Sequence, residues 1–208
     1  TIDTAHRLNA EAVVLHCGRV DIPDRTKELA AFFKEGLKDT REYNRLKGDI
    51  LKERDEIYKP YFENMLRSLE ELSRYAKPKN ISLGIENRIY IREIPAFEEI
   101  GIILNNFRGS NIFYWHDTGH AQVLENLGFT KHQEYLNSFS NNMIGVHLHD
   151  CKATLDHQAP SKGEIDFAML NPYIKQETLK VIEAHHPSTA AELIESKKFL
   201  ETIFNGKL

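Results

Sequence analysis

The sequence predicts an α/β protein of the TIM-barrel, (β/α)8, type, in which a parallel sheet is covered by helices. Short apolar runs alternate with longer segments of helical periodicity, the pattern of parallel strands joined by helices. No glycine-rich phosphate loop follows any of these runs, which disfavours the open nucleotide-binding sheet. Residues that can bind a metal stand at the ends of the runs, and a barrel gathers the C-terminal ends of its strands at one face.

Five apolar runs are expected to be strands, because β-branched and aromatic residues form such runs in sheets covered on both faces. In chain order they cover Ala10 to Gly18, Ile81 to Asn87, Asn111 to Asp117, Met143 to Asp150 and Leu179 to His185. A sixth strand, short or irregular, is expected around the segment GEIDF. The five main runs each place one potential metal ligand near their end: His16, Glu86, Asp117, His147 and Glu183.

The long charged region between the first two strands is expected to be a helical insertion at about residues 21–77 of a single domain, 1–208. Apolar residues recur there at helical spacing, namely Tyr61, Met65, Leu69 and Leu72. Pro60 is expected near the start of this helix, and Gly36 and Gly48 are expected to interrupt earlier helical segments. Its charged face is a solvated surface, with a lid or a dimer contact as the alternative. Further helices are expected at Ile94 to Asn105, Lys131 to Phe139 and Ala190 to Phe204.

Composition excludes several classes of protein. The 208 residues suit one domain, no apolar run approaches the length of a membrane span, and no secretory signal opens the chain. The two cysteines, Cys17 and Cys151, make no disulfide framework and are expected to be buried, unreactive thiols in a cytoplasmic protein. A net charge of −4, with basic residues interleaved with acidic ones, argues against a nucleic-acid partner.

A divalent cation binds carboxylate oxygens and imidazole nitrogens that converge on one point. Four residues would supply three carboxylates and one imidazole at spacings of 31, 30 and 36 residues: Glu86, Asp117, His147 and Glu183. Each spacing is about one strand–helix unit, the period that returns the chain to the same face of a barrel. Simpler interpretations stay open, since Glu86 with Asn87 suits a cap and Asp117 with Gly119 suits a turn.

Other histidines compete for the same site. His149 shares a strand face with His147, so either ring is able to point inward. His116 alternates with Asp117 and is expected to pack on the outer face of the sheet. His185 and His186 are expected in a solvent-facing loop, and Trp115 in the core.

The segments GIEN, HDTGHA, HLHD, DHQAPSKGEIDF and VIEAH occur in this order within the chain from about Ala10 onward. Together they resemble the xylose-isomerase-like barrel superfamily, which includes sugar and sugar-phosphate isomerases and epimerases, inosose dehydratases and endonuclease IV repair enzymes. The resemblance implies roles for single residues. The superfamily's four metal ligands match Glu86, Asp117, His147 and Glu183. Its further histidines, which contact substrate or additional metal ions, match His16, His120 and His157.

The resemblance implies a divalent-metal-dependent isomerase or epimerase of carbohydrate metabolism, acting on a sugar or sugar phosphate through an enediolate. Its cofactor would be one ion of manganese, cobalt, magnesium or zinc, and Glu86 and Glu183 would be the base and acid. The alternatives are a zinc-dependent endonuclease acting on damaged DNA, with several zinc ions, and a barrel that binds a metal or ligand without turnover. Against the endonuclease, its aspartate before the loop histidine falls at Leu155, with Asp156 one place off.

Only five strands are clear, whereas a full barrel has eight strands and roughly 250 residues. The sequence begins with what resembles the helix before the third strand, so the first two βα units are expected to be lacking. An open edge of a parallel sheet invites aggregation. We therefore expect further residues, cleavage or a partner, such as a second copy in a homo-oligomer.

Overall fold

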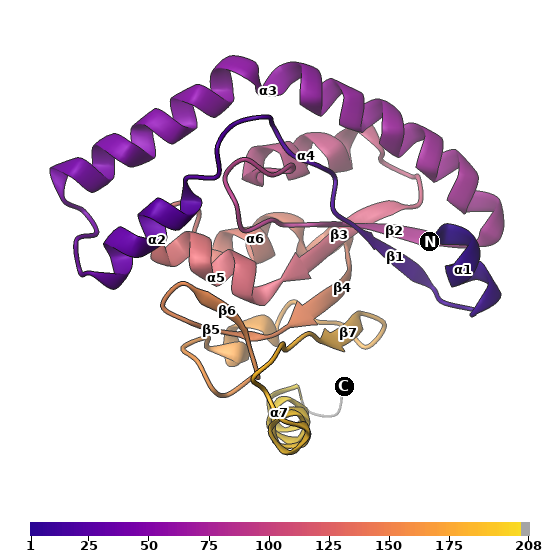
Figure 1. Cartoon of the computed structure of the whole chain (residues 1–208). Coiled ribbons are helices and arrows are strands. Elements are labelled where there is room, and N and C mark those ends of the chain that lie inside the picture. Colours follow the sequence, from indigo (N-terminus) through magenta and orange to yellow (C-terminus); the bar gives the residue numbers. More distant parts are fainter. Residues whose placement is uncertain (205–208) are drawn as a thin grey trace.

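A parallel sheet of five strands forms the centre of the computed structural model, which describes residues 1–204 (Figure 1). The strands are β1 (Ala12–Leu15), β2 (Ser82–Glu86), β3 (Ile112–Asp117), β4 (Met143–Leu148) and β7 (Leu179–Ile182), in the order β1-β2-β3-β4-β7. All five lie within the expected apolar runs. Each strand of this sheet pairs with the sheet strand that follows it in the sequence, as in the wall of a (β/α)8 barrel.

The strand register brings the candidate ligands to one edge of the sheet. Glu86 is paired with Trp115 across β2 and β3, and Asp117 is paired with His147 across β3 and β4. Glu183 follows directly after the last residue of β7, which pairs with Leu148. Because the strands are parallel, all of these positions lie at the C-terminal ends.

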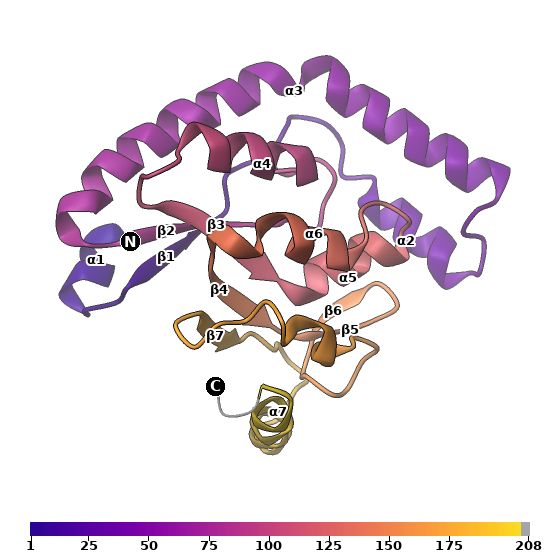
Figure 2. The same ribbon diagram turned by 180° about the vertical axis from the view of Figure 1, so that it is seen from behind.

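Helices cover the sheet, and one of them is much longer than the rest. They are α1 (Ile2–Arg7), α2 (Thr26–Lys34), α3 (Arg41–Ala76), α4 (Phe97–Asn106), α5 (Thr118–Asn126), α6 (His132–Phe139) and α7 (Ala190–Ile203). Figures 1 and 2 show α3 as an arc above α4 and the sheet, with α7 on the opposite side, beyond β7. Three short 3-10 helices are η1 (Lys77–Lys79), η2 (Ser140–Asn142) and η3 (Phe167–Leu170).

The expected breaks inside α3 are wrong, because Gly48 and Pro60 both lie within this 36-residue helix. Gly48 costs about 1 kcal/mol relative to alanine in a helix, and proline disrupts one hydrogen bond and bends the axis. Both residues are exposed, and α3 as a whole forms an arc, a bent shape that tolerates such residues. Packing of the inner face offsets these costs, through buried residues at helical spacing: Tyr43, Leu46, Ile50, Phe62, Met65 and Leu69. Gly36 does follow the end of α2, as expected.

The sixth strand expected around GEIDF is also wrong. Residues 163–166 form a loop before η3, and the amides of Gly163 and Ile165 donate to the carboxylate of Asp150 rather than to a strand. Asp150 itself begins an antiparallel hairpin of β5 (Asp150–Lys152) and β6 (Leu155–Gln158). The sequence had assigned its first residue to the preceding strand.

Two apolar cores lie on either side of the middle of the sheet. One surrounds Tyr114 and Leu148 beneath α4, α5 and α6, and the other surrounds Leu83 and Ile85 beneath α3. Within residues 1–204, β1 and β7 are the outermost strands of the sheet. No helix in this range is long and apolar enough to cross a membrane.

Candidate metal centre

Four residues predicted as metal ligands converge at the C-terminal edge of the sheet. Glu86, Asp117, His147 and Glu183 each offer one ligand atom, and these atoms lie within 4.8 Å of one another. The Nδ1 atom of His147 is their common contact. It lies 2.7 Å from Oε1 of Glu86, 2.8 Å from Oε2 of Glu183 and 3.6 Å from Oδ2 of Asp117.

The two deepest carboxylates of this cluster are held in the ionised form. Burial alone would raise the pKa of Glu86, yet hydrogen bonds with His147 and His16 outweigh it and lower that pKa to about 2. For Asp117 burial again acts upward, but the neighbouring imidazoles of His120, His149 and His147 outweigh it and hold its pKa well below the usual range. Both groups therefore present negative oxygens at neutral pH.

His147 supplies the positive charge among these carboxylates. Burial would lower its pKa, but hydrogen bonds with Asp117, Glu183 and Glu86 raise it to about 11. Three carboxylates this close to one another are stable only beside a cation, since like charges repel strongly where water is excluded. The oxygen-rich donor set with one imidazole fits a divalent cation of the hard or borderline type.

Asn87 fastens β2 to β3 directly behind this cluster. Its side-chain Oδ1 accepts the backbone N–H of Asp117 at 2.8 Å and the hydroxyl of Tyr114 at 2.9 Å, and its Nδ2 donates to the carbonyl of Asp117 at 2.9 Å. The interpretation of Glu86 and Asn87 as a simple cap is therefore wrong. Asn87 is a bridge between strand ends, and it fixes the backbone from which Asp117 projects.

Asp117 caps a helix and also faces the cluster. It is the N-cap of α5, where Oδ1 accepts the N–H of His120 at 2.8 Å. Its other carboxylate oxygen, Oδ2, faces Nδ1 of His147. The helical turn after β3 thus aims the carboxylate into the cluster.

Gly119 serves a different purpose from the sharp turn expected of it. It lies inside α5, and a Cβ there would overlap the ring of His149. The position requires glycine because a neighbouring side chain approaches the backbone closely. The protein thereby seats His149 against the first turn of α5.

His149 is a functional residue that sequence reasoning set aside in favour of His147. Its Nδ1 accepts the backbone N–H of His157 at 2.9 Å, so Nε2 carries the proton and donates to Oδ1 of Asp117 at 2.8 Å. Strand alternation had indicated that His149 faces the same side as His147, which was the available signal. Since both ring nitrogens of His149 are engaged, it orients Asp117 rather than serving as an open ligand.

The predicted substrate-binding histidines lie around the cluster. His120 contacts the carbonyl of Asn87 through Nδ1 at 3.0 Å, and its Nε2 is 3.7 Å from Oδ2 of Asp156. His157 places Nδ1 2.8 Å from the same carboxylate oxygen. His120, His157 and His149 also bring potential ligand atoms within 4.8 Å of one another, although both ring nitrogens of His149 already have partners.

His16 and His185 complete the rim of the site. The Nε2 atom of His16 lies 3.1 Å from Oε2 of Glu86, and its side chain is 66% exposed. His185 is exposed in the loop after β7, as expected, but its ring also stacks on that of His157 with centroids 3.9 Å apart. The open side of the cluster is therefore edged by imidazoles.

Arg88 is a second residue that sequence reasoning missed. Its guanidinium forms an ion pair with Oε2 of Glu86 and a second one, at 3.1 Å, with Oε1 of Glu93. The side chain is buried, so this charge is permanent and poorly screened. Its position two residues after Glu86 was the only signal, and it is a weak one because the strand ends between them.

Trp115, His116 and Cys151 are buried as expected, whereas Cys17 is only partly buried. Trp115 is buried and packs its ring against that of His147, with centroids 5.1 Å apart. His116 lies in the outer-face core, where burial lowers its pKa to about 3 and its Nε2 lies 2.9 Å from Nε2 of His132. Burial raises the pKa of Cys17 and of Cys151 to about 12, so both thiols are unreactive at neutral pH.

No protein-family model and no curated protein sequence matches this chain. Solved structures do match it. A D-tagatose 3-epimerase-like protein has 20% sequence identity to this chain and a TM-score of 0.67. The match covers 98% of this chain and 66% of that protein. The 3-keto-D-glucoside 4-epimerase YcjR from E. coli has 12% identity and a TM-score of 0.63. The match covers 97% of this chain and 67% of YcjR. The IOLI protein with a binding zinc atom has 14% identity and a TM-score of 0.58. The match covers 100% of this chain and 92% of the IOLI protein.

These likenesses establish the fold. The five-stranded parallel sheet is part of a TIM-barrel-like wall of the kind found in xylose-isomerase-like proteins, so the predicted fold class is confirmed. The chain spans about two thirds of the length of the first two proteins, 66% and 67%. At these identities, activity does not follow from the comparison alone.

Proposed function

We propose that this protein is a divalent-metal-dependent isomerase or epimerase that acts on a sugar or sugar phosphate through an enediolate. The observation that carries the proposal is the convergence of Glu86, Asp117, His147 and Glu183 on one point. Support comes from structural neighbours that are sugar epimerases and from one whose structure has a zinc atom. The order of the sequence motifs supports the same chemistry.

The four converging residues would hold the cation, with three carboxylates and one imidazole. When bound, a divalent cation would stabilise the negative charge that develops on the substrate oxygens. Around it, His149 and Asn87 hold Asp117 in place, and Arg88 holds Glu86. Such supporting contacts keep ligands oriented before substrate arrives.

Glu86 and Glu183 are the proposed acid and base. Epimerisation needs a proton removed from the carbon beside a carbonyl and a proton returned to it, from carboxylates within reach of that carbon. The side chain of Glu183 is 35% exposed, whereas Glu86 is almost fully buried. Glu183 therefore meets the entering substrate first, while Glu86 acts from the interior. His16, His120 and His157 are the proposed substrate contacts at the rim.

Deuterium exchange tests the proposal without knowledge of the product. The metal-loaded protein is incubated in D2O with a panel of ketoses and their phosphates, and loss of the proton beside the carbonyl is followed by NMR. We expect exchange with at least one sugar, together with about one metal ion per chain. Glu183→Gln should abolish exchange and weaken metal binding while the fold persists.

The matched control is Glu177→Gln, because Glu177 is exposed and precedes β7 at the end opposite Glu183. It should retain both metal and exchange. Full activity in Glu183→Gln would refute the site assignment. Metal bound without exchange of any sugar in the panel would favour a non-catalytic metal-binding barrel.

A zinc-dependent endonuclease is the second candidate, and one observation favours it. Asp156, one place off the expected position, contacts both His120 and His157, so the offset does not keep it from these histidines. Leu155, which holds the expected position, is exposed. Two or three zinc ions per chain, with cleavage of DNA at abasic sites, would move this function to first place.

A further inference from the structure

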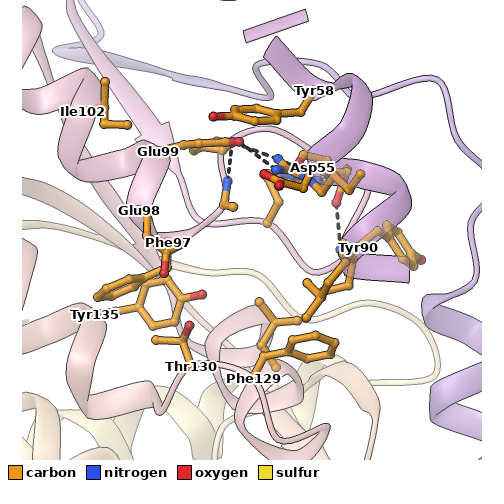
Figure 3. Close-up of a pocket in the computed structure, with 18 of the residues that line it drawn as sticks. Asp55, Tyr58, Tyr90, Phe97, Glu98, Glu99, Ile102, Phe129, Thr130 and Tyr135 are labelled. Carbon is orange, nitrogen blue, oxygen red and sulfur yellow. Dashed lines mark hydrogen bonds and ion pairs between the residues drawn. The ribbon is translucent and has the colours of Figure 1, made fainter. Parts of the chain in front are cut away.

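One cavity lies apart from the metal centre, beneath the arc of α3. Its volume is about 750 Å³, and its walls come from α3, α4, the loop after β2 and the segment around Phe129 (Figure 3). This size is typical of sites for small organic molecules, which occupy roughly 300–1,000 Å³. Arg88 stands in the wall between this cavity and the carboxylate of Glu86.

Aromatic rings line the cavity. Figure 3 shows them around a shared space: Tyr58, Tyr90, Phe97, Phe129 and Tyr135. They come from α3, the loop after β2, α4, the loop after α5, and α6, and Ile102 of α4 adds an aliphatic wall.

Aromatic faces carry partial negative charge and attract cations. Cations of this chain already lie over three of the rings, with Arg54 5.6 Å from the Tyr58 centroid, Lys47 4.5 Å from that of Phe129 and Lys27 5.9 Å from that of Tyr90. Among these five rings, Phe97 and Tyr135 are therefore the ones left to attract the positive group of a ligand with an apolar body.

The charged residues of the cavity fall into two sets. Buried ion pairs neutralise the first set, with Arg54 joined to Glu99 at 2.7 Å and Arg88 joined to Glu93 at 3.1 Å. Asp55 and Glu98 form the second set. Both are exposed, and among the ion pairs formed within residues 1–204 neither takes part in one.

Lys52 also lines the cavity, and it lies 3.9 Å from Glu56 in an exposed ion pair. The lining has three positive side chains, Lys52, Arg54 and Arg88, and four negative ones, Asp55, Glu93, Glu98 and Glu99. Its net charge is therefore negative by one, and the carboxylates outside buried ion pairs are Asp55 on α3 and Glu98 on α4. Opposite walls thus present carboxylates above an aromatic interior, which repels organic anions and attracts organic cations.

We propose that this cavity is a second ligand site, specific for a small organic ammonium compound with an aromatic or aliphatic body. The apolar body fills the space between the rings, and the ammonium group lies near Asp55 and Glu98. The site goes beyond the proposed sugar chemistry, because its lining has none of the four converging metal ligands. The proposed ligand is positively charged and largely apolar, whereas a free sugar is uncharged and polar.

The probe for this site is phenethylammonium, compared with the uncharged 2-phenylethanol, in calorimetric titrations of the full chain. We expect phenethylammonium to bind about tenfold more tightly, from cation–π attraction and two partly screened carboxylates. The double variant Asp55→Asn with Glu98→Gln should remove this preference. Equal affinity of the wild-type protein for both probes would overturn the proposal.

Two further variants locate the binding. Ile102→Trp fills the cavity from an exposed position on α4 and should abolish binding of phenethylammonium. Ile57→Trp adds the same ring at an exposed position of α3 outside the lining, and it should bind as wild type does. Glu183→Gln should also bind as wild type. Loss of binding in Glu183→Gln, with binding retained in Ile102→Trp, would place the ammonium at the metal centre and refute the second site.

Discussion

The Nδ1 atom of His147 lies 2.7 Å from Oε1 of Glu86, which joins the ends of β4 and β2 across the intervening strand β3. The contact contributes to two pKa shifts. Hydrogen bonds with Asp117, Glu183 and Glu86 raise the pKa of His147 to about 11, and hydrogen bonds with His147 and His16 lower that of Glu86 to about 2. At neutral pH the pair is an imidazolium and a carboxylate. A proton thus occupies the nitrogen that a metal would bind.

Metal affinity should therefore rise with pH. A cation binds the deprotonated imidazole, so each ion displaces one proton from His147, and affinity increases about tenfold per pH unit below pH 11. The carboxylates contribute little to this slope between pH 6 and 8, since the pKa values of Glu86, Asp117 and Glu183 are all lowered. Titration with manganese over this range tests the slope. Affinity independent of pH would contradict a protonated His147.

The metal-free protein should lose stability as the pH rises. The folded-state pKa of His147, about 11, lies above the ordinary value of 6.5, so its stabilisation is complete below pH 6.5 and is lost toward pH 11. The loss has an upper limit of about 1.4 kcal/mol per pH unit. Urea unfolding in a chelator between pH 6.5 and 9 measures it. His147→Gln should flatten the profile in this window, and an equal slope in the variant would assign the effect to other groups.

Gly119→Ala should damage the metal centre from outside it. The added methyl displaces His149, which then no longer donates to Asp117, and overpacking costs about 1–3 kcal/mol of stability. Metal affinity and unfolding free energy both report the change. The control is Gly101→Ala in α4, where a Cβ makes an ordinary 3.7 Å contact with Phe139. That variant should be neutral or slightly stabilising, and similar losses in both would indicate general helix damage.

Asp150→Asn should loosen the loop that follows β6. One carboxylate accepts four backbone N–H groups there, from Cys151, Ser161, Gly163 and Ile165. The amide substitute has one acceptor oxygen in place of two, at a cost of about 1–3 kcal/mol. Hydrogen exchange at residues 161–165 should quicken most. The control is Asp166→Asn, which caps only η3 through Ala168, and unchanged exchange in Asp150→Asn would contradict the anchoring role.

The strand ends and their chemistry were predictable because both follow local rules. Apolar runs mark the strands, and parallel strands bring their C-terminal ends together, so Glu86, Asp117, His147 and Glu183 could be placed at one edge without coordinates. What supports these residues depends on approach between distant segments. The fit of His149 against Gly119 and the shared guanidinium of Arg88 leave no periodic trace in the sequence.

In α3 the local sequence preferences predict the wrong structure, because they favour helix boundaries where the helix continues. Gly48 and Pro60 disfavour a helix interior, and local preference alone predicts a helix boundary at each. In α3, burial of an entire helical face outweighs both, and the sequence signal for that burial extends over 36 residues. Local preference decides a helix end only where tertiary packing does not continue past it.

The order of the strands has a mechanical consequence for the metal centre. Three strand spacings separate β2 from β7, about 14 Å in a flat sheet. Yet the carboxylates of Glu86 and Glu183 lie 2.7 and 2.8 Å from a single nitrogen. Bending of the sheet, together with side chains reaching inward, closes that distance. A cation bound by both carboxylates would hold the ends of β2 and β7 together. It would thereby stabilise the bent sheet, and more strongly the more tightly it binds.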